Sequence, residues 1–129
     1  MKNVRVMLVA VLAAVMLSAC GGMGQMDSLF QPSNAQLASG IKSYEEGDYQ
    51  TALLTLRKAQ EMGLSDKRDQ VMAFKYLAFI HCVSGREKDC RDAFKKALII
   101  NPAFELKPAE AGHPVWGPVF RGEKAKYAK

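Results

Sequence analysis

The feature that most restricts the fold of this chain is a helical pattern that occurs twice, each time as two amphipathic stripes separated by a glycine. Apolar residues three or four positions apart mark one face of a helix, and a glycine readily ends a helix. The stripes and the glycines between them lie at 37–44, Gly47 and 52–59, and again at 71–81, Gly85 and 90–98. The sequence therefore predicts an all-α fold with two helical hairpins over residues 33–102.

Polar residues at the ends of the stripes predict where the helices of the first hairpin begin and end. Ser33 and Gln36 have the spacing of a capping box, so the first helix is expected to begin at Ser33 and to run to about Glu46. Asp48 is suited to cap the second helix, which is expected to end near Gly63.

The two hairpins share a sequence template at an offset of 38 residues. The matching positions are Gly40, Gly47, Ala52, Leu56 and Ala59 in the first hairpin and Ala78, Gly85, Cys90, Phe94 and Ala97 in the second. This template resembles the tetratricopeptide repeat, and Tyr49, Leu77 and Pro102 fit further positions of that family. The family spacing is about 34 residues, and Glu87 stands where its second aromatic residue is expected. An ordinary helical bundle is the alternative.

The N-terminal residues have the pattern of an export signal. Two basic residues precede an uncharged run over 6–17, which is shorter than the ~20 residues of a membrane-spanning helix but fits a signal peptide. The run ends in Leu-Ser-Ala-Cys at 17–20, which resembles the lipobox of bacterial lipoproteins. This resemblance implies removal of residues 1–19 and lipidation of Cys20. A soluble secreted protein with an unmodified Cys20 is the alternative.

The lipobox resemblance also implies a location. In such lipoproteins an aspartate after the cysteine favours retention at the inner membrane, whereas here Gly21 follows Cys20. This implies an anchor in the outer membrane on its periplasmic face, so the membrane is the first expected partner. Residues 20–32 contain glycines and a proline and are expected to be a flexible tether.

Cys82 and Cys90 are expected to form a disulfide. They lie at the facing ends of two helices joined by the Gly85 turn, and an exported location favours disulfides. In the chain-entropy model, closing so short a loop stabilises the folded state by about 2–3 kcal/mol. A stable stack usually needs three repeats, so a domain of two repeats depends on such additional stabilisation. A metal site that combines these cysteines with His81 and His113 has no recognised ligand spacing, so we expect no metal and no cofactor.

The C-terminal segment, residues 103–129, is too apolar for a free end, and its prolines and glycines argue against one long helix. Pro118 is suited to begin a last short helix through Tyr127. Trp116 and Phe120 have two interpretations. They cap the second hairpin, or they form part of a partner-binding surface.

A longer combination of motifs resembles a known family. His-Cys at 81–82, Arg-Glu at 86–87 and Cys-Arg-Asp-Ala-Phe at 90–94 are followed by Pro-Ala-Glu-Ala-Gly-His-Pro-Val-Trp-Gly-Pro-Val-Phe at 108–120. Together with the lipobox and the repeats, this combination is similar to the TssQ-type lipoproteins associated with type VI secretion. The resemblance implies an accessory component without enzymatic activity, close to an envelope protein of the secretion machine.

Stacked helical hairpins bind partners in a groove that is formed mainly by the first helix of each pair. The polar residues expected in this groove are Gln36, Lys42, Ser43, Lys67, Gln70 and Lys75. We therefore expect these positions, completed by Trp116 and Phe120, to bind an extended segment or a helix of another protein.

Other function classes find little support in the sequence. A glycine-rich phosphate loop, a Gly-x-Ser-x-Gly motif and a His-Glu-x-x-His motif are all missing, so we expect neither an enzyme nor a small-molecule substrate. The formal charge of +5 becomes +3 when Lys2 and Arg5 leave with the signal, and an exported chain with this mild excess is not expected to bind nucleic acid. Two alternatives to the secretion scaffold are a pilotin or outer-membrane assembly factor and a structural envelope protein that binds peptidoglycan.

Overall fold

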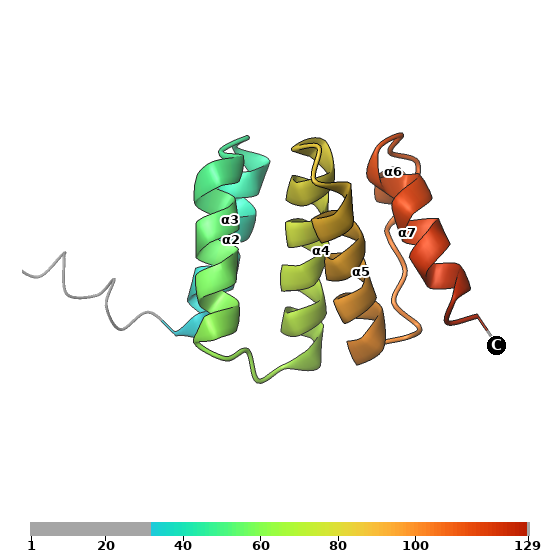
Figure 1. Cartoon of the computed structure of the whole chain (residues 1–129). Coiled ribbons are helices and arrows are strands. Elements are labelled where there is room, and N and C mark those ends of the chain that lie inside the picture. Colours follow the sequence, from blue (N-terminus) through green and yellow to red (C-terminus); the bar gives the residue numbers. More distant parts are fainter. Residues whose placement is uncertain (1–31, 129) are drawn as a thin grey trace, which may run out of the picture. The chain divides into compact units, whose positions relative to one another are not determined.

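The computed structural model describes residues 32–128. The predicted signal peptide, Cys20 and all of the predicted tether except Pro32 lie outside these residues. Within residues 32–128 the chain has six helices and no strand (Figure 1). The helices are α2 (Ser33–Glu45), α3 (Tyr49–Glu61), α4 (Lys67–Val83), α5 (Glu87–Ile100), α6 (Pro108–Ala111) and α7 (Trp116–Ala125). The all-α class predicted from the sequence is confirmed for this part of the chain.

The helices pack in their order along the chain (Figure 1). α2 lies against α3, α4 lies against α5, and both α2 and α3 contact α4. α7 packs mainly on α5 and also contacts α4 and the short α6. The C-terminal segment therefore covers the side of the second helix pair that faces away from the first pair.

Glycines are required at two kinds of position, the turns within the helix pairs and a close helix crossing. Gly47 has a φ of +81° and Gly85 a φ of +74°, values in the left-handed region where a Cβ causes strain. Gly40 instead lies at a close helix crossing, because a Cβ at this position would be 2.7 Å from Cγ of Leu56. α2 can therefore approach α3 closely only without a side chain at Gly40.

The structure confirms one of the two helix caps predicted for the first pair. Asp48 caps α3 as predicted, because its Oδ1 accepts a 3.1 Å hydrogen bond from the backbone N–H of Thr51. The capping box predicted for Ser33 and Gln36 is wrong, because Pro32 holds the N-cap position and Ser33 is already helical. The ring of proline fixes φ, here at −62°, and so directs the chain into the first turn.

The core is formed by the facing sides of α3, α4 and α5. Its largest fully buried side chains include Leu56, Phe79, Ile80, Phe94 and Leu98. Aromatic contacts continue from this core into the C-terminal segment. The ring centroid of Phe94 lies 5.2 Å from that of Phe120, and the ring of Phe79 stacks at 4.2 Å on that of Trp116. α7 therefore closes the core with two aromatic side chains.

α7 begins two residues earlier than predicted. The sequence suggested a start at Pro118 and an end at Tyr127, whereas the helix runs over Trp116–Ala125. Proline is tolerated as the third helical residue because the N–H groups of a first turn have no intrahelical acceptor. The packing of Trp116 thus decides the start of the helix more than the proline does.

Candidate functional site

The structure divides the residues predicted to bind a partner into two groups. Lys42 and Lys67 are exposed, and Ser43 and Gln70 are half-buried. Nε2 of Gln70 donates a 2.6 Å hydrogen bond to the carbonyl oxygen of Leu64. The other four side chains belong to residues that are at most 8% exposed: Gln36, Lys75, Trp116 and Phe120. None of these four residues is exposed to a partner in this structure, and for Trp116 and Phe120 the burial fits the capping interpretation.

Lys75 is buried because the C-terminal segment supplies a carboxylate for it. Its Nζ lies 2.8 Å from Oε1 of Glu110 and 4.7 Å from the ring centroid of Tyr76. The side chain of Lys75 is 4% exposed and that of Glu110 is 18% exposed. A charge so deeply buried is tolerated only with a close partner of opposite sign. Lys75 therefore holds α6 on α4 and is not available to another protein.

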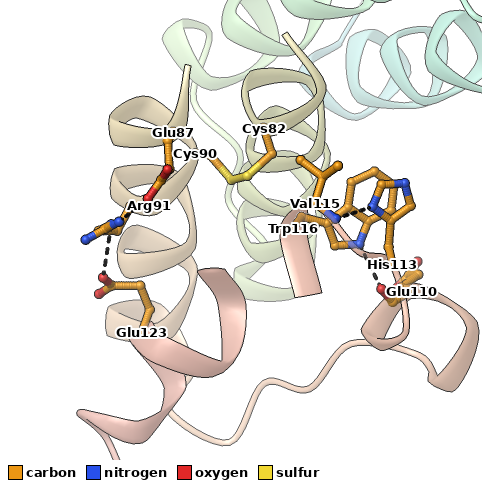
Figure 2. Close-up of a disulfide and its surroundings, with 9 residues drawn as sticks. All are labelled: Cys82, Glu87, Cys90, Arg91, Glu110, His113, Val115, Trp116 and Glu123. Atoms are coloured by element: carbon orange, nitrogen blue, oxygen red, sulfur yellow. Dashed lines mark hydrogen bonds and ion pairs between the residues drawn. A yellow bond between two sulfur atoms is a disulfide. The ribbon is translucent and has the colours of Figure 1, made fainter. Parts of the chain in front are cut away.

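Trp116 is held both by its ring and by its nitrogen. The ring stacks on Phe79 and also on His113, whose ring centroid is 3.4 Å away. Its Nε1 donates a 2.8 Å hydrogen bond to the carbonyl oxygen of Glu110, as Figure 2 shows. The ring of Phe120 contacts the rings of Phe94 and Phe104, and the residue is 3% exposed. These contacts favour the interpretation that both aromatic residues cap the second helix pair.

The predicted disulfide is present at the turn between α4 and α5 (Figure 2). The Sγ atoms of Cys82 and Cys90 are 2.00 Å apart, and their Cα atoms are 5.1 Å apart. The residue after Cys90, Arg91, forms an ion pair with Glu87 at the start of α5. The Nε of Arg91 also lies 3.9 Å from Oε1 of Glu123 on α7. A covalent bond therefore joins α4 to α5, and an ion pair joins α5 to α7.

A pocket that could not be predicted from the sequence lies at the N-terminal end of α4. Its volume is about 380 Å³, and its lining includes Lys67, Arg68, Val71, Met72, Ile100 and Phe104. The four-residue spacing of Lys67, Val71 and Lys75 indicates a shared helix face. The other wall comes from residues 100–104, however, and periodicity cannot predict that this stretch lies beside α4.

His81 is a second buried polar group. It is 6% exposed, and its Nδ1 has no hydrogen-bond partner among the described residues. Nε2 of Gln60 also lacks one there, and both residues line a pocket of about 220 Å³. Burial lowers the pKa of His81, and the positive charge of Arg86 lowers it further. Both effects favour the neutral form of the imidazole.

No protein-family model, curated protein or solved structure matches the chain significantly. In the part of the chain that the structure describes, no group of three or more His, Cys, Asp or Glu side chains is placed to hold a metal ion. Nor is any helix among residues 32–128 long and apolar enough to cross a membrane.

Proposed function

We propose that this chain is a lipoprotein of the outer membrane, on its periplasmic face, that binds an envelope protein of a type VI secretion machine. In this proposal Cys20 carries the lipid, and the pairs α2–α3 and α4–α5 are hairpins of the tetratricopeptide type. The lipobox at 17–20 supports the anchor, and the motifs over 81–120 support the secretion system.

The observation that carries this proposal is the arrangement of α2 and α4. They are the first helices of the two pairs and they contact each other, so Lys42 and Lys67 are exposed on neighbouring helices. In helical repeat proteins, neighbouring first helices form the binding face. Trp116 and the rest of the C-terminal segment supply the cover that a stack of only two repeats requires.

Photo-crosslinking in cells tests the α2–α4 face. A photoreactive amino acid replaces Lys42 or Lys67, and the exposed residues Lys58 on α3 and Lys95 on α5 serve as matched controls. We expect covalent products with an envelope component of the secretion machine from the first pair of positions only. Equal products from both pairs, or none from the first, contradict a binding face on α2 and α4.

Metabolic labelling tests the anchor. The Cys20→Ser variant should incorporate no palmitate and should accumulate as a precursor. Gly21→Asp should move the chain toward the inner-membrane fraction. Palmitate that persists in Cys20→Ser refutes lipidation at this residue, and an unchanged fractionation of Gly21→Asp refutes the sorting argument.

Deletion of the protein tests the assignment to type VI secretion. We expect reduced secretion and the loss of cross-links to the machine. If secretion is unaffected, two other outcomes identify the alternatives. A failure of an outer-membrane channel to assemble indicates a pilotin, and retention of the protein on purified cell wall indicates a peptidoglycan-binding protein.

A further inference from the structure

The pocket at the N-terminal end of α4 is open because the chain after α5 does not form a helix there. α4 presents one face to the C-terminal segment along its length. The C-terminal half of this face, at Lys75 and Phe79, is covered by α6 and α7. The first two turns, around Arg68 and Met72, have the last residue of α5, Ile100, and then the non-helical stretch 101–107 beside them. A stretch without helix fills less space than a helix, so a volume of about 380 Å³ remains.

The floor of this pocket is apolar. Val71 is 6% exposed, and Met72, Ile100 and Phe104 are half-buried. The volume lies within the range of about 300–1,000 Å³ that is usual for ligand pockets. An apolar side chain that entered it would remove its own surface and that of the floor from water, at roughly 25 cal/mol per Å². The floor therefore suits one bulky apolar group.

The rim of the pocket is basic. Lys67 and Arg68 line it and are exposed, and neither forms an ion pair with another residue of the 32–128 region. The carboxylate of Asp66 is already used to cap α4, because it accepts a 2.7 Å hydrogen bond from the backbone N–H of Arg68. Two cations beside an apolar floor are complementary to an apolar side chain with carboxylates next to it.

We propose that this pocket anchors an acidic segment of the protein partner. One bulky apolar side chain of that segment packs on Met72 and Phe104, and carboxylates next to it in the segment bind Lys67 and Arg68. This proposal rests on the proposed function, because it names the chemistry of the partner at one end of the α2–α4 face. Lys75, which also lines the pocket, is already neutralised by Glu110 and does not take part.

Methyl NMR of the full chain in detergent tests this proposal, with the methionine methyl groups labelled by carbon-13. The probe is the peptide acetyl-Asp-Glu-Phe-Asp-Glu-amide. We expect a saturable shift of the Met72 methyl signal and no shift of Met62, which is exposed at the end of α3. Peptides with Ala in place of Phe, or with Lys in place of the four acids, should bind at least about tenfold more weakly.

Charge-reversal variants supply the matched control. Lys67→Glu with Arg68→Glu should weaken peptide binding about tenfold. Lys58→Glu with Lys95→Glu changes the net charge equally on α3 and α5 and should leave binding unchanged. An unshifted Met72 signal, or equal binding of the acidic and basic peptides, overturns the proposal. So does a Met72 shift that depends on protein concentration without peptide, because a second copy would then occupy the pocket.

Cross-linking separates this proposal from the proposed function. If Lys67→Glu with Arg68→Glu leaves the cross-links from Lys42 to the secretion machine intact, the pocket proposal fails and the function stands. If the unmodified protein gives no such cross-links, the proposed function fails, whatever the peptide result.

Discussion

Lys75 and Glu110 form a buried ion pair of 2.8 Å across 35 positions of the sequence. The pair joins the middle of α4 to the short α6. Glu110 is used three times, because its Oε2 also accepts a 3.0 Å hydrogen bond from the N–H of Lys107 and its carbonyl oxygen accepts the one from Trp116. Glu110 thus holds both α6 and the side chain of Trp116, which caps the second helix pair.

Glu110→Ala should lower the free energy of unfolding by about 3 kcal/mol, because it leaves the Lys75 ammonium buried without a partner. The matched control is Glu105→Ala. Glu105 is 66% exposed in its ion pair with Lys124, so its loss should cost at most about 1 kcal/mol. Urea unfolding measures both values. Equal losses of unfolding free energy in the two variants would show that the buried Lys75 does not depend on Glu110. The double variant Lys75→Met with Glu110→Ala should be more stable than Glu110→Ala alone, because it no longer buries an unpaired ammonium.

Two glycines of α7 should respond in opposite directions to alanine. A Cβ at Gly117 would lie 2.6 Å from the carbonyl oxygen of Ala111, whereas a Cβ at Gly122 would meet no atom within 4 Å. Gly117→Ala should therefore lower the free energy of unfolding by about 1–3 kcal/mol. Gly122→Ala should raise it by about 0.5–1 kcal/mol, since alanine favours helix. Denaturant unfolding that gives both variants the same sign contradicts the packing of α7 on α6.

Trp116→Ala should destabilise the fold by about 3–5 kcal/mol, since it removes a buried ring from the end of the core. Val115 is 45% exposed, so Val115→Ala is the control and should change little. Circular dichroism and cross-linking of the same variant distinguish the two roles. Lost helicity shows a cap, whereas full helicity with lost cross-links shows an interface and contradicts our assignment.

Reduction of the Cys82–Cys90 bond should lower the free energy of unfolding by about 2–3 kcal/mol by the chain-entropy model. Mass spectrometry of protein isolated without reductant should find the two cysteines in one cross-linked peptide. A variant with both cysteines replaced by Ala should melt at the same temperature whether or not reductant is present. Two free thiols in the isolated protein contradict the disulfide.

The stability of the fold should fall with acid because of His81. Burial holds the pKa of His81 below its ordinary value of 6.5, so the unfolded chain binds a proton more readily than the folded one. The stability that the neutral ring contributes to the folded state is therefore fully present above pH 6.5. It is lost as the pH falls toward the pKa that His81 has in the folded state. Unfolding measured between pH 7 and pH 5 should show a smaller decrease for His81→Gln. Identical pH profiles contradict this prediction.

The helix pairs could be predicted from the sequence because their signals are local. The turns need Gly47 and Gly85, and the apolar stripes recur at helical spacing on each side of them. The disulfide followed from the same local geometry, since Cys82 and Cys90 lie on the two sides of one turn.

The role of Lys75 could not be predicted in the same way. Spacing alone places it with Lys67 and Gln70 on the polar face of a helix, in the expected groove, where a lysine is normally solvated. It is buried only because Glu110 returns to α4 from 35 positions away. The pocket beside Met72 was missed for the same reason, because its second wall depends on the path of residues 101–107.

The contact between Lys75 and Glu110 also has a consequence for the order in which the fold is completed. Glu110 follows Lys75 in the sequence by 35 positions, and Trp116 lies further on. A ribosome therefore makes α4 before the groups that neutralise its lysine and cover Phe79. Until these groups are in place, this face of α4 stays open to water. A chain truncated before Glu110 should therefore remain a substrate for proteases and chaperones.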